Sequence, residues 1–197
     1  MKPLILIYTN TFGGRSEVFV YRQVSRLYRY RCHVATGTYR RRDLFPFEPV
    51  TELDFQNPLL HRGFQAFYGL RHLCWPTTDA IRSKQLKQLG RRLRPDVIHT
   101  HFLWNSTGPA LAARTLDVPF AVTAHGSDVN RARKDGNYRK GVKRTFDLAD
   151  RVIAVSDFIA DQLIGIGCPA RKITRLRLGV PVPELFAATK AQGDVVD

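Results

Sequence analysis

Short apolar runs, bounded by turn-forming residues, alternate with helical patterns along most of the chain. The clearest runs are LILIY, HVAT, DVIHT, FAVTA, RVIAV and KITRL, at residues 4–8, 33–36, 96–100, 120–124, 151–155 and 172–176. A further strand is expected near residues 50–53, inside a long segment that mixes prolines, arginines and aromatic residues. Short runs that are apolar on both faces are typical of a parallel sheet covered by helices on both sides.

The segments between these runs carry apolar residues at helical spacing, at residues 17–30, 80–93, 106–116, 138–149 and 157–166. Ser16 is the expected N-cap of the first helix. Residues 61–75 predict an amphipathic helix whose basic and aromatic side chains fit either a membrane surface or packing against the core. Strands alternating with helices predict an α/β fold, a Rossmann-like parallel sheet with helices on both faces.

The composition is consistent with this fold, and it gives the chain a large positive charge. The 197 residues suit one domain with a substantial core, and 44% hydrophobic and 24% charged residues are typical of globular proteins. The formal charge of +14 predicts attraction to polyanions, which include nucleic acid, anionic lipid headgroups and phosphorylated small molecules. Three widely spaced cysteines without a CxxC pair indicate neither a disulfide framework nor a zinc site, and fit a reducing cytosol.

The candidate chemistry lies where strands end, since ligands of parallel sheets bind beyond the carboxyl ends of the strands. TNTFGGRSE places Gly13, Gly14 and Arg15 between the first strand and the first helix, where backbone amides and the helix dipole favour a phosphate. A simple tight turn explains the two glycines equally well. The chain lacks the GxGxxG fingerprint, which argues against a nicotinamide dehydrogenase.

The strand DVIHT runs into HTHFLWN, which places His99 and His101 on one side of the strand. Two histidines at this spacing suit a metal, but no carboxylate or cysteine lies nearby in the sequence, and we expect no metal. We expect one histidine to pack near the sheet and the other to face a cleft, and we include His101 in the candidate site. Asn105 is a candidate site residue and a candidate cap for the next helix.

The stretch AVTAHGSD, at residues 121–128, begins as a buried strand and ends in polar residues. His125 can donate a hydrogen bond to a substrate hydroxyl or carbonyl, Gly126 permits the turn, and Asp128 can accept from a hydroxyl or orient a cation. Alternatively, Ser127 or Asp128 caps a helix. Ser156, in AVSDFI, ends another strand and has the same two interpretations.

Taken in order, these pieces resemble the N-terminal half of family 4 type glycosyltransferases with the GT-B fold, and within them the subset that builds surface glycans. The resemblance rests on GGRSEVFVYRQVSRL, RPDVIHTHF, VPFAVTAHGSDV and ADRVIAVSDFIADQLIGIGCPARKITRLRLGV. It implies a Rossmann-like acceptor-binding domain over residues 1–185. Residues 186–197 are then a tail or the start of a linker to a donor-binding domain that lies outside these 197 residues.

The resemblance also implies a retaining transfer from a nucleotide-diphosphate sugar to a lipid-linked or saccharide acceptor, without metal or cofactor. Gly13 and Gly14 would form the loop that approaches the donor diphosphate and the acceptor, and His125 would be the catalytic residue that touches the donor sugar. The remaining substrate-binding candidates are Arg15, His101, Asn105, Gly126, Asp128 and Ser156. Two features depart from the family pattern: RYRCHV lacks a usual glycine, and Gly179-Val180-Pro181 stands where Gly-Val-Asp is common.

These inferences predict a cytoplasmic chain, peripheral on the inner face of the plasma membrane, whose basic surface docks on anionic lipid. A donor-binding domain would be its partner, in cis or as a separate chain. The alternative is a basic, non-catalytic module for nucleic acid or a partner protein, with arginines at 29–31, 40–42 and 91–94 as contacts. Nucleic acid is the weaker choice because no RNA-binding aromatic signature, zinc finger or helix-turn-helix is evident.

Overall fold

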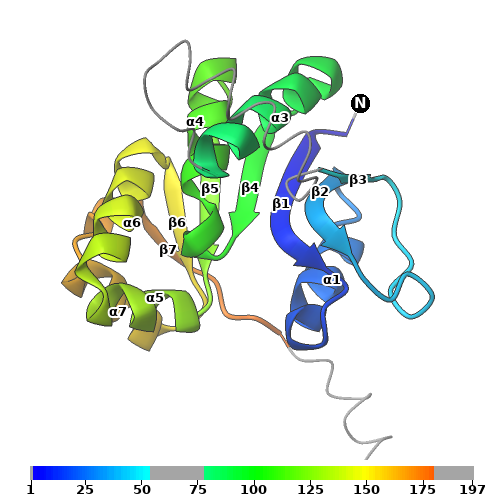
Figure 1. Ribbon diagram of the computed structural model, residues 1–197. Helices are drawn as coiled ribbons and strands as arrows, with labels where there is room; N and C mark the ends of the chain where they lie inside the picture. The colour runs from blue at the N-terminus through cyan, green and yellow to red at the C-terminus, as the bar shows by residue number, and fades with distance from the viewer. Residues whose placement is uncertain (1, 54–77, 180–197) are drawn as a thin grey trace, which may run out of the picture.

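The computed structural model describes residues 2–53 and 78–179, which form a parallel sheet with helices packed on it. Seven strands follow the order β3-β2-β1-β4-β5-β6-β7 (Figure 1). The strands are β1 (Leu4–Phe12), β2 (Arg31–Tyr39), β3 (Val50–Glu52), β4 (Val97–His101), β5 (Phe120–Ala124), β6 (Arg151–Ala154) and β7 (Ile173–Arg175). Every neighbouring pair is parallel, so the carboxyl ends of all seven lie at one edge. The Rossmann-like α/β prediction is confirmed.

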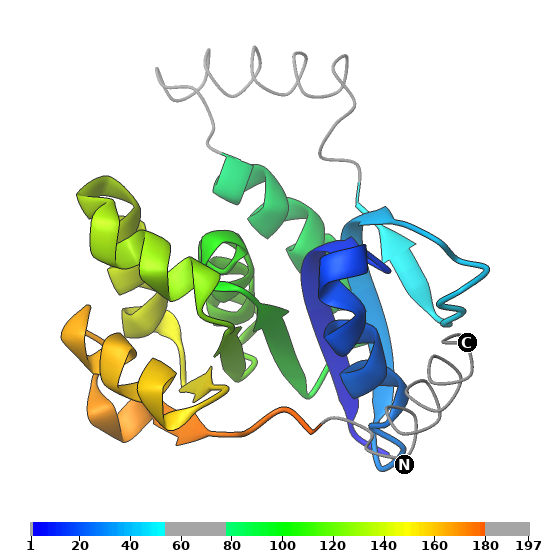
Figure 2. The ribbon, with the colours of Figure 1, turned by 90° about the horizontal axis from the view of Figure 1, so that it is seen from below.

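Helix α1 (Val18–Ser25) covers one face of the sheet, and the other helices pack in a second cluster. These others are α3 (Thr78–Leu93), α4 (Thr107–Leu116), α5 (Ser127–Lys134), α6 (Gly136–Leu148) and α7 (Asp157–Gly165). Figure 2 shows α1 in front of β1 and β2. Val20 and Val24 of α1 pack with Ile7 of β1 and Val34 of β2 in one apolar cluster.

The opposite face of the sheet carries the larger core. Leu6 and Tyr8 alternate with Ile7 along β1 and therefore point to this second face, where α3, α4, α6 and α7 supply apolar side chains. Phe120 and Phe146 are among its largest fully buried side chains. These two clusters hold the loops at the carboxyl edge in fixed positions.

The predicted strands are all present, but β1 and β2 extend further than the apolar runs indicated. Thr11 pairs with Thr38 and Phe12 with Tyr39, so the polar residues that follow the two runs continue the ladder. The prediction for residues 17–30 was too long, because α1 ends at Ser25 and the chain turns to enter β2 at Arg31. Pairing of β2 with β1 from its first residue sets that end.

Local details of the helices also differ from the predictions. Ser16 does not cap α1, because it lies inside a 3-10 turn (Arg15–Glu17) and α1 has Glu17 at its N-cap. The helix predicted at residues 138–149 begins earlier, at Gly136, where the Asp135 side chain accepts hydrogen bonds from two backbone N–H groups. Helix α5 begins at Ser127, as the alternative of a helix cap at Ser127 or Asp128 implied, although its extent was not predicted.

Three expectations concern residues outside the described part of the chain. These are the helix over residues 61–75, the thiol of Cys74, and the domain boundary at residue 185 with the tail that follows. Within the described residues, no helix is long and apolar enough to cross a membrane.

Candidate functional site

The carboxyl edge of the sheet brings together segments that are far apart in the sequence. The strand order changes direction between β1 and β4, which is where ligands of open parallel sheets bind. Phe19, at the start of α1, follows the glycine loop after β1, and Phe102 follows β4. The ring of His125, which follows β5, lies with its centroid 4.5 Å from that of each phenylalanine. The start of α1, the segment after β4 and the end of β5 therefore meet at this edge.

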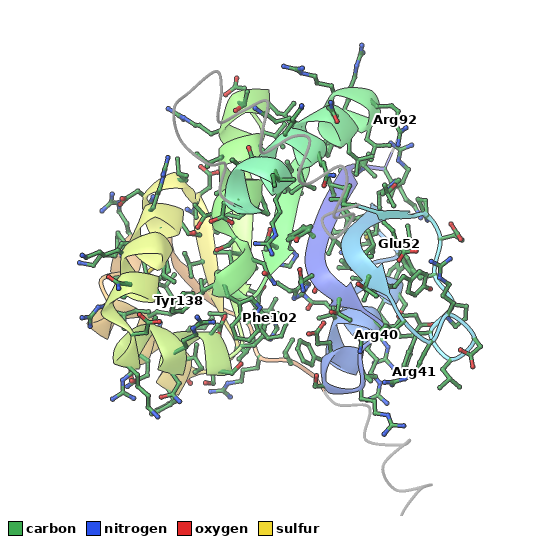
Figure 3. The ribbon with its side chains drawn as sticks, in the orientation of Figure 1. Arg40, Arg41, Glu52, Arg92, Phe102 and Tyr138 are labelled. Carbon is green, nitrogen blue, oxygen red and sulfur yellow. The ribbon has the colours of Figure 1, made fainter. Side chains whose placement is uncertain are left out.

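His125 is partly buried against these two aromatic rings, whose centroids lie 6.1 Å from each other. Figure 3 labels Phe102 at this edge. Burial, with a smaller contribution from His99, lowers the pKa of His125 to about 4. The imidazole is consequently neutral at neutral pH, with one N–H that can donate a hydrogen bond and one nitrogen that can accept one.

Two further histidines stand behind His125 on β4. Nδ1 of His101 lies 3.1 Å from Nε2 of His125, and the two rings are stacked with centroids 5.3 Å apart. His99 lies next, with Nε2 at 2.8 Å from the hydroxyl of Thr123. Burial lowers the pKa of His99 to about 4 and that of His101 well below its usual value.

The structure buries both β4 histidines, whereas the sequence suggested that one would face a cleft. His101 has an exposed fraction of 0% and His99 one of 8%. His101 therefore touches His125 rather than an open surface. Among the described residues, no group of three or more His, Cys, Asp or Glu side chains is placed to hold a metal ion.

Asp128 connects the ends of β4 and β5 through its carboxylate. Oδ1 accepts hydrogen bonds from the backbone N–H groups of His125, Gly126 and Val129, and Oδ2 accepts one from that of Leu103. Burial raises the pKa of Asp128, and these four bonds oppose that shift. The side chain is fully buried, and both of its oxygens already accept hydrogen bonds from the backbone. The interpretation of Asp128 as a helix cap therefore accounts for this residue.

Gly126 is required by the backbone at this turn, because its φ of 110° belongs to a region that other residues rarely adopt. It immediately precedes α5. The turn rotates the chain out of β5 and leaves the His125 side chain at the rim.

The backbone requires a glycine at position 13 but not at position 14. Gly13 has a φ of 75°, and a Cβ at this position would overlap the backbone carbonyl oxygen of Arg40. The tight-turn interpretation therefore explains Gly13. Gly14 has a φ of −67°, and a Cβ there would make only ordinary contacts, the nearest 3.5 Å from a methyl carbon of Thr11. Nothing in its surroundings demands a glycine. Arg15 is exposed beside it.

The last two site candidates, Ser156 and Asn105, have structural roles or buried positions that explain them. The Ser156 hydroxyl accepts a hydrogen bond from the backbone N–H of Ile159 at 3.2 Å, so it caps α7 as the alternative interpretation held. Asn105 is buried at 5% exposure and does not cap α4, whose N-cap position is Ser106. Asn105 fails as a cap because a short 3-10 turn, Leu103–Asn105, intervenes between β4 and α4.

Phe19 and Phe102 are site residues that the sequence reasoning missed. Phe102 has a φ of 69°, which is strained for a bulky side chain. Its backbone N–H donates to the carbonyl of Thr123, and its ring stacks on Trp104 with centroids 4.6 Å apart. These contacts hold the strained residue against His125, and strain of this kind is frequent at functional sites. An aromatic residue after a buried strand is too common a signal to have identified it.

The three arginine clusters lie at two edges of the sheet. Arg31, of the cluster at 29–31, and Arg92, of the cluster at 91–94, line one cavity near the amino ends of β1 and β2. Residues 40–42 follow β2 at the carboxyl edge, whereas residues 91–94 precede β4 at the amino edge. Figure 3 shows Arg40 and Arg41 well separated from Arg92. Three cavities lined by described residues also lie away from His125, and the largest of these, 480 Å³, is beside Cys32 near the amino ends of β1 and β2.

Comparison with protein families gives the site its context. The model of Glycosyltransferase Family 4 matches residues 13–183. The chain belongs to this family. The matched residues include the glycine loop, both β4 histidines and His125, so the family relationship covers the whole carboxyl edge.

Relatives of this Family 4 chain are longer than the chain itself. TuaC of Bacillus subtilis, named as a teichuronic acid biosynthesis glycosyltransferase, is 33% identical over 132 residues, which are 64% of this chain and 32% of TuaC. HepE of Anabaena, solved with UDP-glucose, has a TM-score of 0.65 at 18% identity, over 98% of this chain and 50% of HepE. The UDP-N-acetylglucosamine 2-epimerase of Rickettsia bellii has a TM-score of 0.63 at 12% identity, over 100% and 50%. The chain thus spans about half the length of the solved structures it matches, and these two likenesses concern the fold.

Proposed function

We propose that the chain is the acceptor-binding half of a retaining glycosyltransferase. It would act on a nucleotide-diphosphate sugar and a lipid-linked or saccharide acceptor in surface glycan synthesis, together with a donor-binding domain. Membership of Family 4 and the likeness to TuaC support this assignment. The fold shared with HepE, which was solved with UDP-glucose, supports a nucleotide-sugar donor.

The observation that carries the proposal is the position and charge state of His125. Its neutral imidazole stands at the carboxyl edge of the sheet between Phe19 and Phe102. His125 is partly buried against them, and a hydrogen bond made at a partly buried place is stronger than one made in bulk solvent. A neutral donor can hold a sugar hydroxyl without adding a positive charge that would attract other anions to the same place.

The transfer itself breaks the bond between the sugar and the diphosphate and forms one to an acceptor hydroxyl. Negative charge develops on the diphosphate, and positive charge and backbone amides that face it lower the barrier, an effect often worth several kcal/mol. In this chain, the proposed amide-bearing segment is the loop after β1 that contains Gly14, a buried glycine whose ordinary φ does not itself require glycine. His125 would orient the sugar while the diphosphate leaves.

The experiment that tests the proposal replaces His125 by alanine in the chain joined to a donor-binding domain. Transfer from UDP-glucose and related donors should fall by about a hundredfold or more, while the thermal unfolding midpoint stays close to that of the parent protein. His33→Ala is the matched control, because it removes another buried histidine, bonded to Thr51 far from this edge, and should retain transfer. Normal transfer by the His125→Ala protein would reduce His125 to a structural residue.

The proposed membrane partner is supported by a basic surface next to the site. Helices α5 and α6 follow His125 and carry seven exposed cations: Arg131, Arg133, Lys134, Arg139, Lys140, Lys143 and Arg144. Two acidic residues accompany them: Asp135, which is paired with Arg131 at 4.0 Å, and Asp147, which is exposed near the end of α6. Each cation near an anionic leaflet contributes about 1 kcal/mol of attraction. A lipid-linked acceptor would then be delivered beside His125.

Vesicle flotation at low salt tests this partner. The chain should float with vesicles that contain phosphatidylserine or phosphatidylglycerol and remain unbound with phosphatidylcholine alone. Lys140→Gln with Arg144→Gln should weaken binding by about thirtyfold, since two charges worth about 1 kcal/mol each are removed. Arg91→Gln with Arg92→Gln removes the same charge at the opposite edge and should bind as the parent does. Equal recovery on neutral and anionic vesicles would contradict the proposal.

A further inference from the structure

In the pair formed by His101 and His125, one ring nitrogen of His101 has a hydrogen-bond partner and the other has none. This difference determines which nitrogen of each ring carries the proton. Nδ1 of His101 lies 3.1 Å from Nε2 of His125, within hydrogen-bond distance. The other ring nitrogen of His101, Nε2, is fully buried and has no hydrogen-bond partner. His125 remains partly exposed, and the described residues make no hydrogen bond to its Nδ1.

Two arrangements of protons are compatible with this geometry, because each neutral imidazole carries one N–H. In the first, Nδ1–H of His101 donates to Nε2 of His125, and the proton of His125 is on Nδ1. In the second, Nε2–H of His125 donates to Nδ1 of His101, and the proton of His101 is on its buried Nε2. Both rings are neutral because burial lowers the pKa of each.

The two arrangements differ in what they leave unpaired inside the protein. The first leaves a lone pair on the buried Nε2 of His101, whereas the second leaves a buried N–H. Buried N–H groups without an acceptor are the rarer of the two in folded proteins, and an unpaired buried polar group costs about 1–3 kcal/mol. The rings of His99 and His125 flank His101, with centroids 4.7 Å and 5.3 Å away, which leaves its edge no space to turn toward solvent. The first arrangement is therefore favoured.

We infer that His101 is a positioning residue, which holds His125 in the tautomer that carries its proton on Nδ1 and so presents an N–H donor to the substrate. The hydrogen bond at one imidazole nitrogen sets the role of the other. A donor selects an oxygen lone pair, on a sugar hydroxyl or a phosphate, and an acceptor in the same place would select a hydroxyl proton. The inferred tautomer of His125 does not depend on the proposed function. That its N–H binds a sugar rests on the function proposed above.

The tautomer is tested directly on the 197-residue chain by nuclear magnetic resonance. A nitrogen-proton correlation spectrum of the ¹⁵N-labelled imidazoles distinguishes a protonated Nδ1 from a protonated Nε2. At neutral pH, the parent protein should show His125 with the proton on Nδ1. His101→Phe keeps an aromatic ring but removes the donor, and should move His125 to the other tautomer.

Two controls keep this test decisive. His101→Asn places an amide nitrogen near the position of Nδ1 and should preserve the parent tautomer, and His33→Phe replaces a distant buried histidine and should also preserve it. The inference is overturned if the parent carries the proton on Nε2, or if His101→Phe leaves the tautomer unchanged. The parent spectrum decides the matter even where a variant fails to fold.

Activity provides an independent second readout in the chain joined to a donor-binding domain. His101→Phe should lower kcat/KM by about tenfold or more, as loss of a supporting hydrogen bond commonly does. Added to His125→Ala, it should have no further effect, because the two residues act as a unit. Absence of any transfer in the parent would refute the proposed function and leave the tautomer result intact. An additive effect of the two substitutions would refute the positioning role alone.

Discussion

Gly13 and Gly14 are adjacent in the chain, yet only one of them is required by the backbone. A residue other than glycine at position 13 would need a positive φ and would meet the carbonyl of Arg40, whereas position 14 has an ordinary φ and a Cβ there would make only ordinary contacts with Thr11 and Glu17. A glycine that the fold does not need, in a loop at the ligand edge, is a reasonable candidate for close approach of a ligand to the backbone.

Replacing each glycine by alanine separates these two roles. Gly13→Ala should lower the free energy of unfolding by about 2 kcal/mol or more, since positive-φ strain and a steric overlap add. Gly14→Ala should leave stability unchanged or raise it by up to about 1 kcal/mol. Urea unfolding of the 197-residue chain measures both.

The same pair also tests the ligand role of Gly14. In the chain joined to a donor-binding domain, Gly14→Ala should reduce transfer at unchanged stability, because a diphosphate that approaches the backbone of this loop closely would be kept away by a Cβ. Full activity of a stable Gly14→Ala protein would mean that the loop merely turns the chain.

At the scale of secondary-structure elements, the carboxylate of Asp128 fixes the start of α5 against the segment that follows β4. Four backbone N–H groups, from His125, Gly126, Val129 and Leu103, all donate to it. This side chain therefore positions both His125 and the strained Phe102 by holding the chain on either side of them.

Asp128→Asn should destabilise the protein by about 1–3 kcal/mol, because the amide NH₂ would face a backbone donor and one bond would be lost. Asp135→Asn is the matched control. Asp135 caps α6 at a more exposed position, and asparagine caps as well as aspartate does, so its unfolding midpoint should stay near the parent value. Equal midpoints for the two variants would contradict the structural role of Asp128.

The elements themselves were predicted well wherever periodicity is strong, and poorly where polar residues begin an element. Seven strands were expected and seven are present in the described residues. Helix α5 was expected only as an alternative, from a cap at Ser127 or Asp128, because SDVNRARK has little apolar character and its Val129 and Ala132 are buried through contacts with the rest of the fold. The end of α1 was missed because it depends on where β2 must start pairing with β1.

At the scale of the whole molecule, the three clustered histidines link stability to pH. The pKa values of His99 and His125 are lowered to about 4, and that of His101 is lowered well below its usual value. In mildly acidic solution the unfolded chain therefore binds more protons than the native state. Where the unfolded state binds more protons, stability rises with pH. Stability should thus be complete above about pH 6.5, the ordinary histidine value, and decline as pH falls from there toward about 4.

Urea midpoints measured between neutral and mildly acidic pH check this expectation. Each histidine contributes a slope of at most about 1.4 kcal/mol per pH unit in that window. His99→Gln removes one of the three groups and should flatten the profile, and a loss of stability with the same slope as the parent would show that other groups are responsible. Asp128, whose pKa is raised, titrates with the opposite sign and is unchanged in this comparison.

The sequence by itself determined the alternation of strands and helices, the parallel sheet, the family motifs and the place of His125 at a strand end. It did so because apolar periodicity and turn residues act on neighbours along the chain. Only the tertiary structure decided that Phe19 and Phe102 flank His125, that His101 is buried behind it, and that the oxygens of Asp128 are already bonded. These contacts join residues far apart in sequence, so they depend on the strand order and on which side chains fill the space between strands and helices.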